Sequence, residues 1–489
     1  MSKTIIIIGA GLAGLSAALQ AAENGCNVKL VSSLPSERAQ SVMAEGGINA
    51  ALNTKDENDS PEEHFTDTIK AACGLADPNA VWGMTQAAPE LVHWLLKLGV
   101  KFNMSGYDDV DLRNFGGQKK KRTAFAQSDT GKQIMTAMID AVRRKEASGM
   151  VERFSHHSFL TLRLCGNICC GCVIRDEYSQ ETVELPGDAV IVATGGMHGL
   201  FGNTTGSLSN TGEVTAELFR LGVPLANGEM IQYHPTTVKC GGKRMLISEA
   251  ARGEGGRLFA MKDGKQWYFM EEKYPELGNL MPRDITAREI WKVSHESEVF
   301  LDMTEISEEI ISNKLSGLAD DCMTYLHKDI RKEPVSVLPG IHYFMGGILV
   351  DEQHRTPIQN LCAAGECCAQ YHGANRLGGN SLLGALYGGR VAAKSACEQA
   401  DVVDLSCATQ IDFPPASQIS EIKQLNKVMQ ETMGVVRNEN TLLNGIQTVQ
   451  ALTGNLPLLG MAVLKSALAR KESRGAHWRE DYPKSNDDD

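Results

Sequence analysis

The chain has 489 residues, and its 60 acidic side chains outnumber 48 basic ones to give a net charge of −12. This length exceeds what one hydrophobic core normally serves, so we expect two or three domains. The acidic excess argues against nucleic acid or an anionic membrane as the main partner. The short basic run at residues 119–122 is predicted to be a solvated loop.

Thirteen cysteines are present without the regular spacing of a disulfide framework, and the chain starts without the charged region and cleavage site of a signal peptide. We therefore expect a protein of the reducing cytoplasm. Residues 4–22 are uncharged and nearly long enough to span a membrane, but their three glycines at fixed offsets favour a strand, a turn and a helix. No transmembrane helix is predicted.

Four cysteines lie close together in the sequence, at positions 165, 169, 170 and 172, and Cys169 and Cys172 have the C-x-x-C spacing. A zinc site would need a second cysteine pair at a suitable distance, and none follows. The surrounding residues are instead predicted to form two strands around a turn at Gly166 and Asn167. We expect no metal here.

The N-terminal residues predict a nucleotide-binding βαβ unit. A buried strand leads to Gly9-x-Gly11-x-x-Gly14, an alanine-rich helix follows, and a second strand ends near Val31. These glycines allow a tight turn and bring backbone N–H groups to a pyrophosphate at the helix N-terminus. Ser32 stands about where the acidic residue that binds a ribose hydroxyl is usual, so a plain NAD dehydrogenase is disfavoured.

Two later segments return to the strand-and-glycine pattern. Residues 187–206 predict a second buried strand ending in glycines, and residues 361–364 predict a third, followed by a glycine-rich helix from about Ser381. Paired glycine sites of this kind suit FAD. Further helices are predicted at 79–98 and 131–147.

Between about 230 and 343 the pattern changes to short strands, loops and a helix starting near Asp284, with many His, Arg and Glu residues. This change predicts an inserted domain. After Pro414 and Pro415, apolar residues recur with a period of 3.6 through 419–436, which predicts helices.

Ionisable side chains gather beside glycines in four places. The stretches are YHPTTV (His234), LISEAARGEGGRLF (Ser248, Glu249, Arg252, Glu254), LMPRDITARE (Arg283, Asp284, Arg288), and GIHYFMGGI with HGANRLGGNSLLG (His342, Arg376). A single histidine or Arg–Glu pair usually has only a structural role. Together, three arginines and two histidines beside a flavin-type fold predict a cationic pocket that holds a small dianion by bidentate pairs.

These motifs resemble one family over almost the whole chain: the flavoprotein subunit of fumarate reductase and succinate dehydrogenase, in the group that also contains L-aspartate oxidase. The matching stretches are IIGAGLAGLSAAL, AEGGINAAL, RNFGGQKKKRTAFAQSDTG, VIVATGG, QYHPT, SEAARGEGG, PRD, HYFMGGI, AAGECC, GANRLGGNSLL and RKESRGAHWREDYP. The resemblance implies an α/β fold with a Rossmann-like FAD-binding domain at 1–230 and 344–405, an inserted α+β capping domain at 231–343, and a C-terminal helical domain at 416–489.

The resemblance also implies roles for the pocket residues. Arg283 matches the proton donor, and Glu249 and Arg252 match its relay. An arginine ordinarily stays protonated, so the relay has to return the proton at once. The residues that match positions binding the substrate carboxylates are His234, Ser248, His342 and Arg376.

Phe115 matches a segment of the substrate wall, where L-aspartate oxidases usually carry a glutamate suited to an ammonium group. An apolar phenyl ring favours a substrate without an amine. The resemblance therefore implies a fumarate reductase flavoprotein, in which a hydride passes from flavin N5 to fumarate and an arginine supplies the proton to give succinate. The alternatives are L-aspartate oxidase, a reductase of another unsaturated carboxylate, and an electron carrier or redox sensor with a relict pocket.

FAD is the expected cofactor. At Gly46 and Gly47 we expect the backbone to approach the isoalloxazine ring so closely that a side chain would collide with it. The residues expected to bind FAD are Gly9, Gly11, Gly14, Ser32, Ser41, Gly46, Gly47, Ala193, Thr194, Gly195, Glu213, Glu366, Ser381 and Leu382.

Gln40 falls where the membrane-bound members of the family place a histidine that is covalently linked to the flavin. A carboxamide cannot make that bond, so we expect non-covalent FAD and a bias toward fumarate reduction. The sequence has no haem motif or ferredoxin-type cysteine run. Electrons are therefore expected from an iron–sulfur subunit or a soluble donor, and a partner subunit would attach this otherwise cytoplasmic protein to the membrane periphery.

Overall fold

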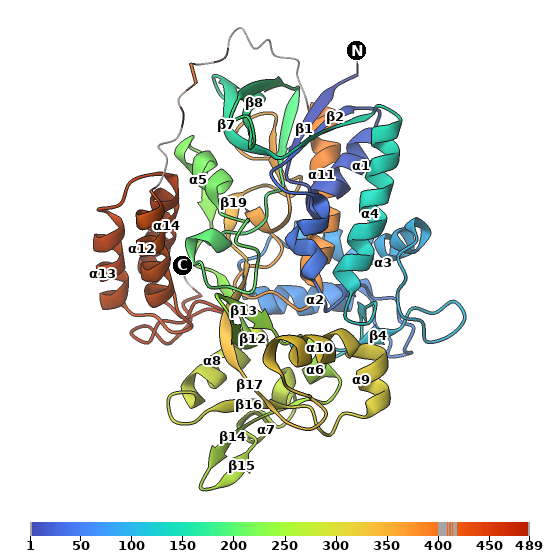
Figure 1. Ribbon diagram of the computed structural model, residues 1–489, viewed down its shortest axis with the longest axis vertical. Coiled ribbons are helices and arrows are strands. Elements are labelled where there is room, and N and C mark those ends of the chain that lie inside the picture. The colour runs from blue at the N-terminus through green and yellow to red at the C-terminus, as the bar shows by residue number, and fades with distance from the viewer. Residues whose placement is uncertain (1, 400–407, 409, 412, 414–417, 488–489) are drawn as a thin grey trace.

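The structure is a computed structural model, which describes residues 2–399, 408, 410, 411, 413 and 418–487. Figure 1 shows a sheet with its helices at the top, a lower part made of the middle of the chain, and a group of C-terminal helices at one side. The predicted end of the FAD-binding domain at 405 and the predicted start of the helical domain at 416 lie outside the described residues. The division into domains remains a prediction, and we call residues 231–343 the insert.

A five-stranded parallel sheet forms the upper part, in the order β20-β10-β1-β2-β6. Its strands are β1 (Thr4–Ile8), β2 (Asn27–Ser32), β6 (Val151–Ser155), β10 (Ala189–Val192) and β20 (Leu361–Ala363). In β1, Ile5 and Ile7 pack with the helices while Ile6 and Ile8 pack with a second sheet, so both faces are buried and the strand is continuously apolar. The strand order reverses between β1 and β10, and open α/β sheets bind ligands beyond the carboxyl ends of the strands at such a point.

Helices cover one face of this sheet. They are α1 (Leu12–Glu23), α3 (Pro78–Leu98), α4 (Thr130–Ala147) and α11 (Asn380–Gln399), with α2 (Pro61–Ala72) packed on α3. The helices predicted at 79–98, at 131–147 and from 381 are confirmed to within one residue. Local signals explain this agreement: the Asp77 carboxylate accepts hydrogen bonds from the first N–H groups of α3, and Gly99 ends that helix at a φ of 100°.

A second, antiparallel sheet covers the other face with β7 (His157–Cys165), β8 (Ile168–Asp176) and β9 (Thr182–Pro186). The two strands predicted around Gly166 and Asn167 are thus confirmed. Cys169 and Cys172 are buried free thiols of β8. Within the described residues, no group of three or more His, Cys, Asp or Glu side chains could hold a metal ion.

The insert begins and ends on paired strands. β12 (Ile231–Cys240) and β18 (Leu338–Phe344) are antiparallel, with Ile231 opposite Phe344 and Gln232 opposite Tyr343. Between them the chain forms its own apolar core. Its remaining elements are β13 (Lys243–Leu246), α6 (Glu249–Gly253), β14 (Arg257–Lys262), β15 (Lys265–Trp267), α7 (Phe269–Lys273), α8 (Arg283–Val293), β16 (Val299–Asp302), α9 (Glu308–Lys314), α10 (Ser316–Asp321) and β17 (Val335–Ser336).

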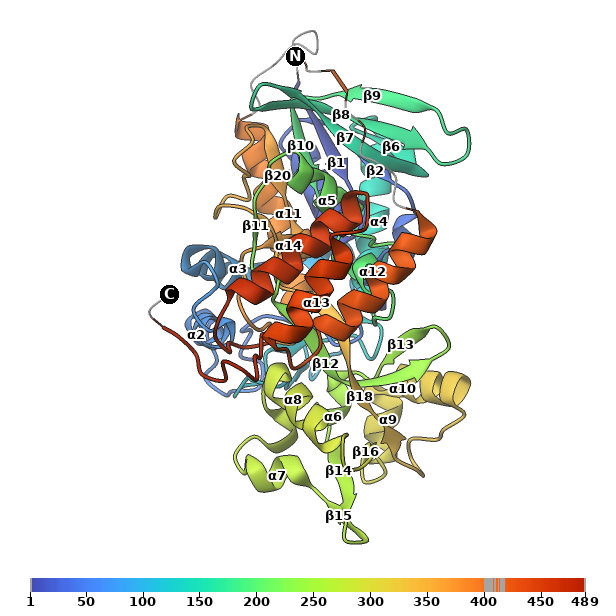
Figure 2. The ribbon, with the colours of Figure 1, turned by 90° about the vertical axis from the view of Figure 1, so that its left-hand side faces the viewer.

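Three C-terminal helices pack against the side of the molecule, as Figure 2 shows: α12 (Ile419–Thr432), α13 (Glu439–Val449) and α14 (Asn455–Ala469). Leu425, Leu459 and Val463 join a core with Phe201 and Phe344. The predicted helical character of this region is confirmed. The remaining elements are short: β3 (Ile48–Asn49), β4 (Leu112–Arg113), β5 (Thr123–Ala124), α5 (Glu213–Arg220), β11 (Leu225–Ala226), β19 (Gly347–Leu349), β21 (Cys368–Ala369), and single turns at Ser36–Arg38, Gln40–Met43, His198–Leu200, Gly278–Leu280, Cys322–Leu326 and Gly365–Cys367.

The basic run at 119–122 is not a purely solvated loop, so that prediction is wrong for its last residue. Arg122 is fully buried and forms ion pairs with Asp59 at 2.8 Å and with Asp67 at 2.9 Å. A charge run in sequence does not reveal which member finds carboxylates elsewhere in the chain. Through these ion pairs Arg122, which lies just before β5, holds that segment against α2 and the residues before it.

None of the described helices is both long enough and apolar enough to cross a membrane.

Candidate active site

A cavity of about 1170 Å³ opens beyond the carboxyl ends of β1, β2 and β10 and continues to the insert. It lies at the switch point of the sheet, where a nucleotide is expected. The predicted FAD-binding residues that line it are Gly9, Gly11, Ser32, Ser41, Gly46, Gly47, Ala193, Thr194, Gly195, Glu213, Glu366, Ser381 and Leu382. Gly14 does not line it.

The end of the cavity at α1 fits a pyrophosphate. Helix α1 starts after Gly11 without a side-chain cap, which leaves N–H groups of its first turn available to an anion. A Cβ atom on Gly9 would lie 2.2 Å from the Ala193 carbonyl oxygen, and one on Gly14 would lie 1.9 Å from the Gly9 carbonyl oxygen. Gly14 therefore serves helix–strand packing, and its predicted contact with the cofactor is replaced by a supporting role.

Neighbouring polar groups also suit a dinucleotide. The Ser32 hydroxyl at the end of β2 is buried without a hydrogen-bond partner among the described residues, as expected of a group that meets a ribose. Ser41 Oγ accepts a hydrogen bond from the Leu12 N–H at 3.2 Å, and Glu366 accepts one from the Phe344 N–H at 3.1 Å. Burial, and then the neighbouring Glu217, raises the pKa of Glu213.

Gln40 lies on a single helical turn, Gln40–Met43, at the cavity wall. Its side-chain oxygen accepts a hydrogen bond from the Ser207 N–H at 2.6 Å. This oxygen therefore already has a hydrogen-bond donor from the protein itself.

Gly46 and Gly47 line the cavity as predicted, but protein atoms alone already require glycine there. A Cβ atom on Gly46 would lie 2.8 Å from Cζ of Phe115, and one on Gly47 would lie 2.5 Å from the Ala124 carbonyl oxygen. Gly47 also has a φ of 135°, which favours glycine. The approach of the isoalloxazine ring to these glycines remains a prediction.

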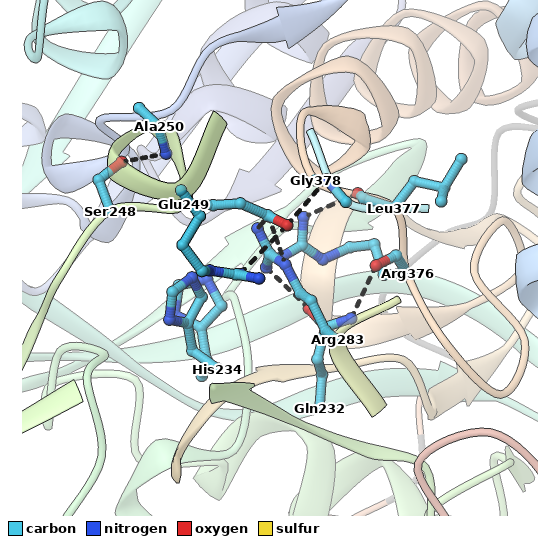
Figure 3. Close-up of polar contacts among 12 residues, drawn as sticks. Gln232, His234, Ser248, Glu249, Ala250, Arg283, Arg376, Leu377 and Gly378 are labelled. Atoms are coloured by element: carbon cyan, nitrogen blue, oxygen red, sulfur yellow. Dashed lines mark hydrogen bonds and ion pairs between the residues drawn. The ribbon is translucent and has the colours of Figure 1, made fainter. Parts of the chain in front are cut away.

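The insert contributes a buried ion-pair chain (Figure 3). Arg283, the first residue of α8, donates to one carboxylate oxygen of Glu249 from Nε at 2.8 Å and from Nη2 at 2.5 Å. The other Glu249 oxygen accepts from the Gly116 N–H at 3.0 Å and lies 3.3 Å from Arg252 Nη2. Glu249 and Arg252 share one side of the short helix α6.

Burial alone would raise the pKa of Glu249, but the charges of Arg283 and Arg252 lower it below its ordinary value. Glu249 is therefore an anion between two cations. Arg283 and Glu249 line the cavity, whereas Arg252 lies behind them and donates to the Asn279 carbonyl oxygen at 2.6 Å.

Two histidines face each other on the strands that bound the insert, with ring centroids 5.1 Å apart. His234 Nδ1 lies 3.1 Å from the Thr236 carbonyl oxygen, and His342 Nδ1 lies 2.8 Å from the Thr205 hydroxyl. Burial, and then the charge of Arg283, holds the pKa of both rings well below the ordinary value. Both rings are neutral at pH 7.

Arg376 enters the same cavity from the loop before α11. It is buried, its guanidinium lies 4.2 Å from the centre of the Tyr343 ring, and its Nε has no hydrogen-bond partner among the described residues. Burial, and then the charge of Arg283, lowers its pKa to about 9, so it remains a cation at neutral pH. Its Nη1 donates to the Leu377 carbonyl oxygen at 3.3 Å, but no carboxylate among the described residues forms an ion pair with it, so this buried cation is a ready anion site.

Ser248 and Phe115 complete the set. The Ser248 hydroxyl accepts a hydrogen bond from the Ala250 N–H at 3.4 Å and so caps α6, while Phe115 is buried and borders the cavity beside Gly46. The structure thus brings every predicted substrate-binding residue to one cavity. Their roles remain predictions.

Gln232 was missed by the sequence analysis. Its side-chain oxygen accepts from Arg283 Nη1 at 3.0 Å, and its nitrogen donates to the Arg376 carbonyl oxygen at 2.7 Å (Figure 3). It therefore connects the two arginines while it is itself buried. Strand alternation could have indicated it, because residues 232 and 234 of one strand share a face.

Glu45 was also missed. It lines the cavity near Ser248, and one carboxyl oxygen has no hydrogen-bond partner among the described residues. Burial, and then the nearby Asp321, raises its pKa to about 8. Nothing in the local sequence signals this, because Asp321 belongs to the insert.

Comparison with known proteins identifies the family. A model of the FAD binding domain matches residues 4–382, and a model of the fumarate reductase flavoprotein C-terminus matches residues 453–489. The succinate dehydrogenase flavoprotein subunit of Bacillus subtilis is 38% identical, over 100% of this chain and 92% of its own. The chain belongs to the succinate dehydrogenase and fumarate reductase flavoprotein family. It is an FAD-dependent oxidoreductase, as the sequence predicted.

Other members of the family show how broad the resemblance is. The L-aspartate oxidase of Pyrococcus furiosus is 32% identical over 99% of this chain and 97% of its own. Among solved structures, a variant of the quinol fumarate reductase FrdA of E. coli superposes with a TM-score of 0.90 at 27% identity, over 100% of this chain and 93% of that one. The predicted α/β fold class is thereby confirmed.

Proposed function

We propose that this flavoprotein reduces fumarate to succinate. The observation that carries the proposal is the charge of the pocket. Within the group of predicted site residues, Arg252, Arg283 and Arg376 contribute three positive charges and Glu249 contributes one negative charge, while both histidines are neutral, which gives this group a net charge of +2. A small dicarboxylate dianion balances this charge, whereas a monoanion or neutral substrate would leave buried charge uncompensated.

The residues divide the work by position. Arg376, His342, His234 and Ser248 bind the two carboxylates and stabilise the negative charge that develops on one of them. When bound, FAD supplies the hydride from its N5 atom. Arg283 gives a proton to the other alkene carbon, and Glu249 with Arg252 behind it restores that proton.

Phe115 supports a substrate without an amine. Its phenyl ring borders the cavity, where it offers no carboxylate to pair with an ammonium group. L-aspartate oxidase is the second candidate, because the Pyrococcus furiosus enzyme of that name is 32% identical along nearly the whole chain. A reductase of another unsaturated carboxylate differs only in what meets the far end of the substrate.

The FAD is held non-covalently in this proposal, because the Gln40 carboxamide cannot form a covalent bond to the flavin. Its oxygen already accepts a hydrogen bond from the Ser207 N–H. Acid precipitation tests this point: all yellow colour is expected in the supernatant. Colour that stays with the precipitated chain would overturn the claim. Non-covalent FAD favours reduction of fumarate over oxidation of succinate in this family.

An iron–sulfur subunit or a soluble donor supplies the electrons in this proposal. The protein would then reside in the cytoplasm and reach the membrane periphery through such a subunit. Titration of the oxidised flavin with candidate reduced donors tests this directly.

The decisive experiment uses the FAD-loaded protein, reduced without oxygen. Fumarate, iminoaspartate or a larger enoate is added, and recovery of the oxidised flavin spectrum is followed. Fumarate is expected to reoxidise the flavin fastest, and no reoxidation by fumarate would sink the proposal. Arg283→Ala is expected to keep FAD but lose at least about 10²-fold in rate, since the proton donor is gone.

A further inference from the structure

Helices α1 and α11 lie side by side, and both begin at the FAD cavity (Figure 1). The Ser16 hydroxyl donates to the Leu386 carbonyl oxygen at 2.6 Å, and a Cβ atom on Gly389 would lie 2.3 Å from the Ala13 carbonyl oxygen. The two backbones therefore approach as closely as glycine permits. The helices run in the same direction, so their far ends also meet.

At those far ends two thiols are in contact. The sulfur atoms of Cys26 and Cys397 are 3.0 Å apart, and neither cysteine is in a disulfide. Cys26 is buried, whereas Cys397 is partly exposed and so can be reached from solvent. Both backbones are fixed: the Cys26 N–H donates to the Ala21 carbonyl oxygen at 3.0 Å, and the Cys397 carbonyl oxygen accepts from Lys3 Nζ at 2.7 Å.

We propose that Cys26 and Cys397 form an oxidative modification site, which closes into a reversible disulfide when the protein meets hydrogen peroxide. Cys397 attacks one peroxide oxygen, the O–O bond breaks, and a sulfenic acid and one water form. Cys26 then attacks the Cys397 sulfur, the S–O bond breaks, and a second water leaves. Two thiols thus lose two electrons and two protons, and one peroxide becomes two waters.

The contact decides which product forms. A sulfenic acid beside a second thiol condenses to a disulfide instead of advancing to irreversible sulfinic acid. Burial, and then the hydrogen bond with Cys26, raises the pKa of the Cys397 thiol to about 12, so thiolate is scarce and the first step is slow. The pair therefore records sustained rather than brief exposure to peroxide.

The bond would close a loop between positions 26 and 397, which lie 371 residues apart in the sequence. Cross-links that close long loops restrict the unfolded chain most. This one also joins the two helices whose first turns line the FAD cavity. We expect oxidation to raise the midpoint of thermal FAD release by roughly 3–5 °C.

The test uses the FAD-loaded protein, treated with peroxide or with dithiothreitol. Unreacted thiols are alkylated, and peptides are mapped by mass spectrometry to find a peptide pair linked through positions 26 and 397. FAD release on heating is followed by flavin fluorescence. The variants are Cys397→Ser, Cys397→Ala in case serine destabilises the fold, and the control Cys73→Ser, whose partly buried free thiol hydrogen-bonds to the Ala71 carbonyl oxygen and lies far from the Cys26–Cys397 pair in the sequence.

In the wild type and in Cys73→Ser we expect the linked peptide and the rise in the midpoint of FAD release, and we expect dithiothreitol to reverse both. Both Cys397 variants are expected to show neither. Full alkylation of both cysteines after peroxide treatment would overturn the proposal. So would sulfinic acid on Cys397 with Cys26 still free. The peptide map of the wild type is independent of whether any variant folds.

Discussion

Gln232→Met is the perturbation that tests how Arg283, the proposed proton donor, is held. In the wild type, Arg283 is fixed on one side by two hydrogen bonds to Glu249 and on the other by one from Nη1 to Gln232 at 3.0 Å. Methionine keeps the length of the side chain but accepts no comparable hydrogen bond. It also removes the donor to the Arg376 carbonyl oxygen.

The expected magnitude follows from these contacts. Gln232 does not line the cavity, so it is a positioning residue, and its nitrogen meets the main chain of Arg376 and not the guanidinium that is proposed to bind a carboxylate. A hydrogen bond to a charged group is worth about 1.5–3 kcal/mol. If that stabilisation acts on the aligned state of Arg283, the rate falls about 10- to 150-fold. We expect this loss in kcat, with little change in KM.

The assay is anaerobic fumarate reduction under steady-state turnover with an excess of chemical reductant, at several fumarate concentrations so that kcat and KM separate. The matched control is Gln370→Met, because Gln370 is also buried and donates to a backbone carbonyl, that of Asp351. Unchanged kcat in Gln232→Met, with thermal stability equal to the control, would refute the reasoning. An equal loss in both variants would show that any buried glutamine has this effect.

Two further predictions concern stability. The pKa of Glu45 is raised from 4.5 to about 8 in the folded protein, so the unfolded state loses this proton first as the pH rises. The stabilisation that the protonated carboxyl gives to the fold is complete below pH 4.5 and falls by up to about 4 kcal/mol as the pH rises to 8. Glu45→Gln should therefore gain stability over wild type between pH 5 and pH 8.5 in urea unfolding, whereas a constant difference would contradict the pKa. Arg122→Met leaves Asp59 and Asp67 without their cation and should lower the free energy of unfolding by about 3–5 kcal/mol, and Asp59→Asn in the same chain should recover part of it.

Local signals explain why so much of the fold was predictable. The isoleucine run of β1 and the glycines after it specify a strand, a turn and a helix within about twenty residues. Helix ends were found to within one residue because caps such as Asp77 and Gly99 act on their own backbone. The cavity residues were predictable for a different reason: their motifs match those of a family, whereas their spacing alone does not reveal a pocket.

What the sequence did not reveal depends on partners far along the chain. Gln232 matters because it hydrogen-bonds to both Arg283 and Arg376. The pKa of Glu45 is raised because the side chain is buried and lies near a carboxylate of the insert. In the sequence Arg122 resembles its lysine neighbours, and only the folded chain brings it to the buried carboxylate of Asp59. Such contacts are properties of the packed chain, and no propensity or period within a short window encodes them.

Two hydrogen bonds join the residues that hold Arg283 to the part of the chain outside the insert. Glu249 reaches out of the insert to the Gly116 N–H, and Gln232 reaches to the Arg376 carbonyl oxygen. Each of these bonds also fixes a residue that holds Arg283. Glu249 and Gln232, which hold Arg283 within the insert, are thus also tied to residues 116 and 376 outside it. In the function proposed above, displacement of the insert would break these two contacts and move Arg283, the proposed proton donor, away from Arg376, the proposed carboxylate-binding residue.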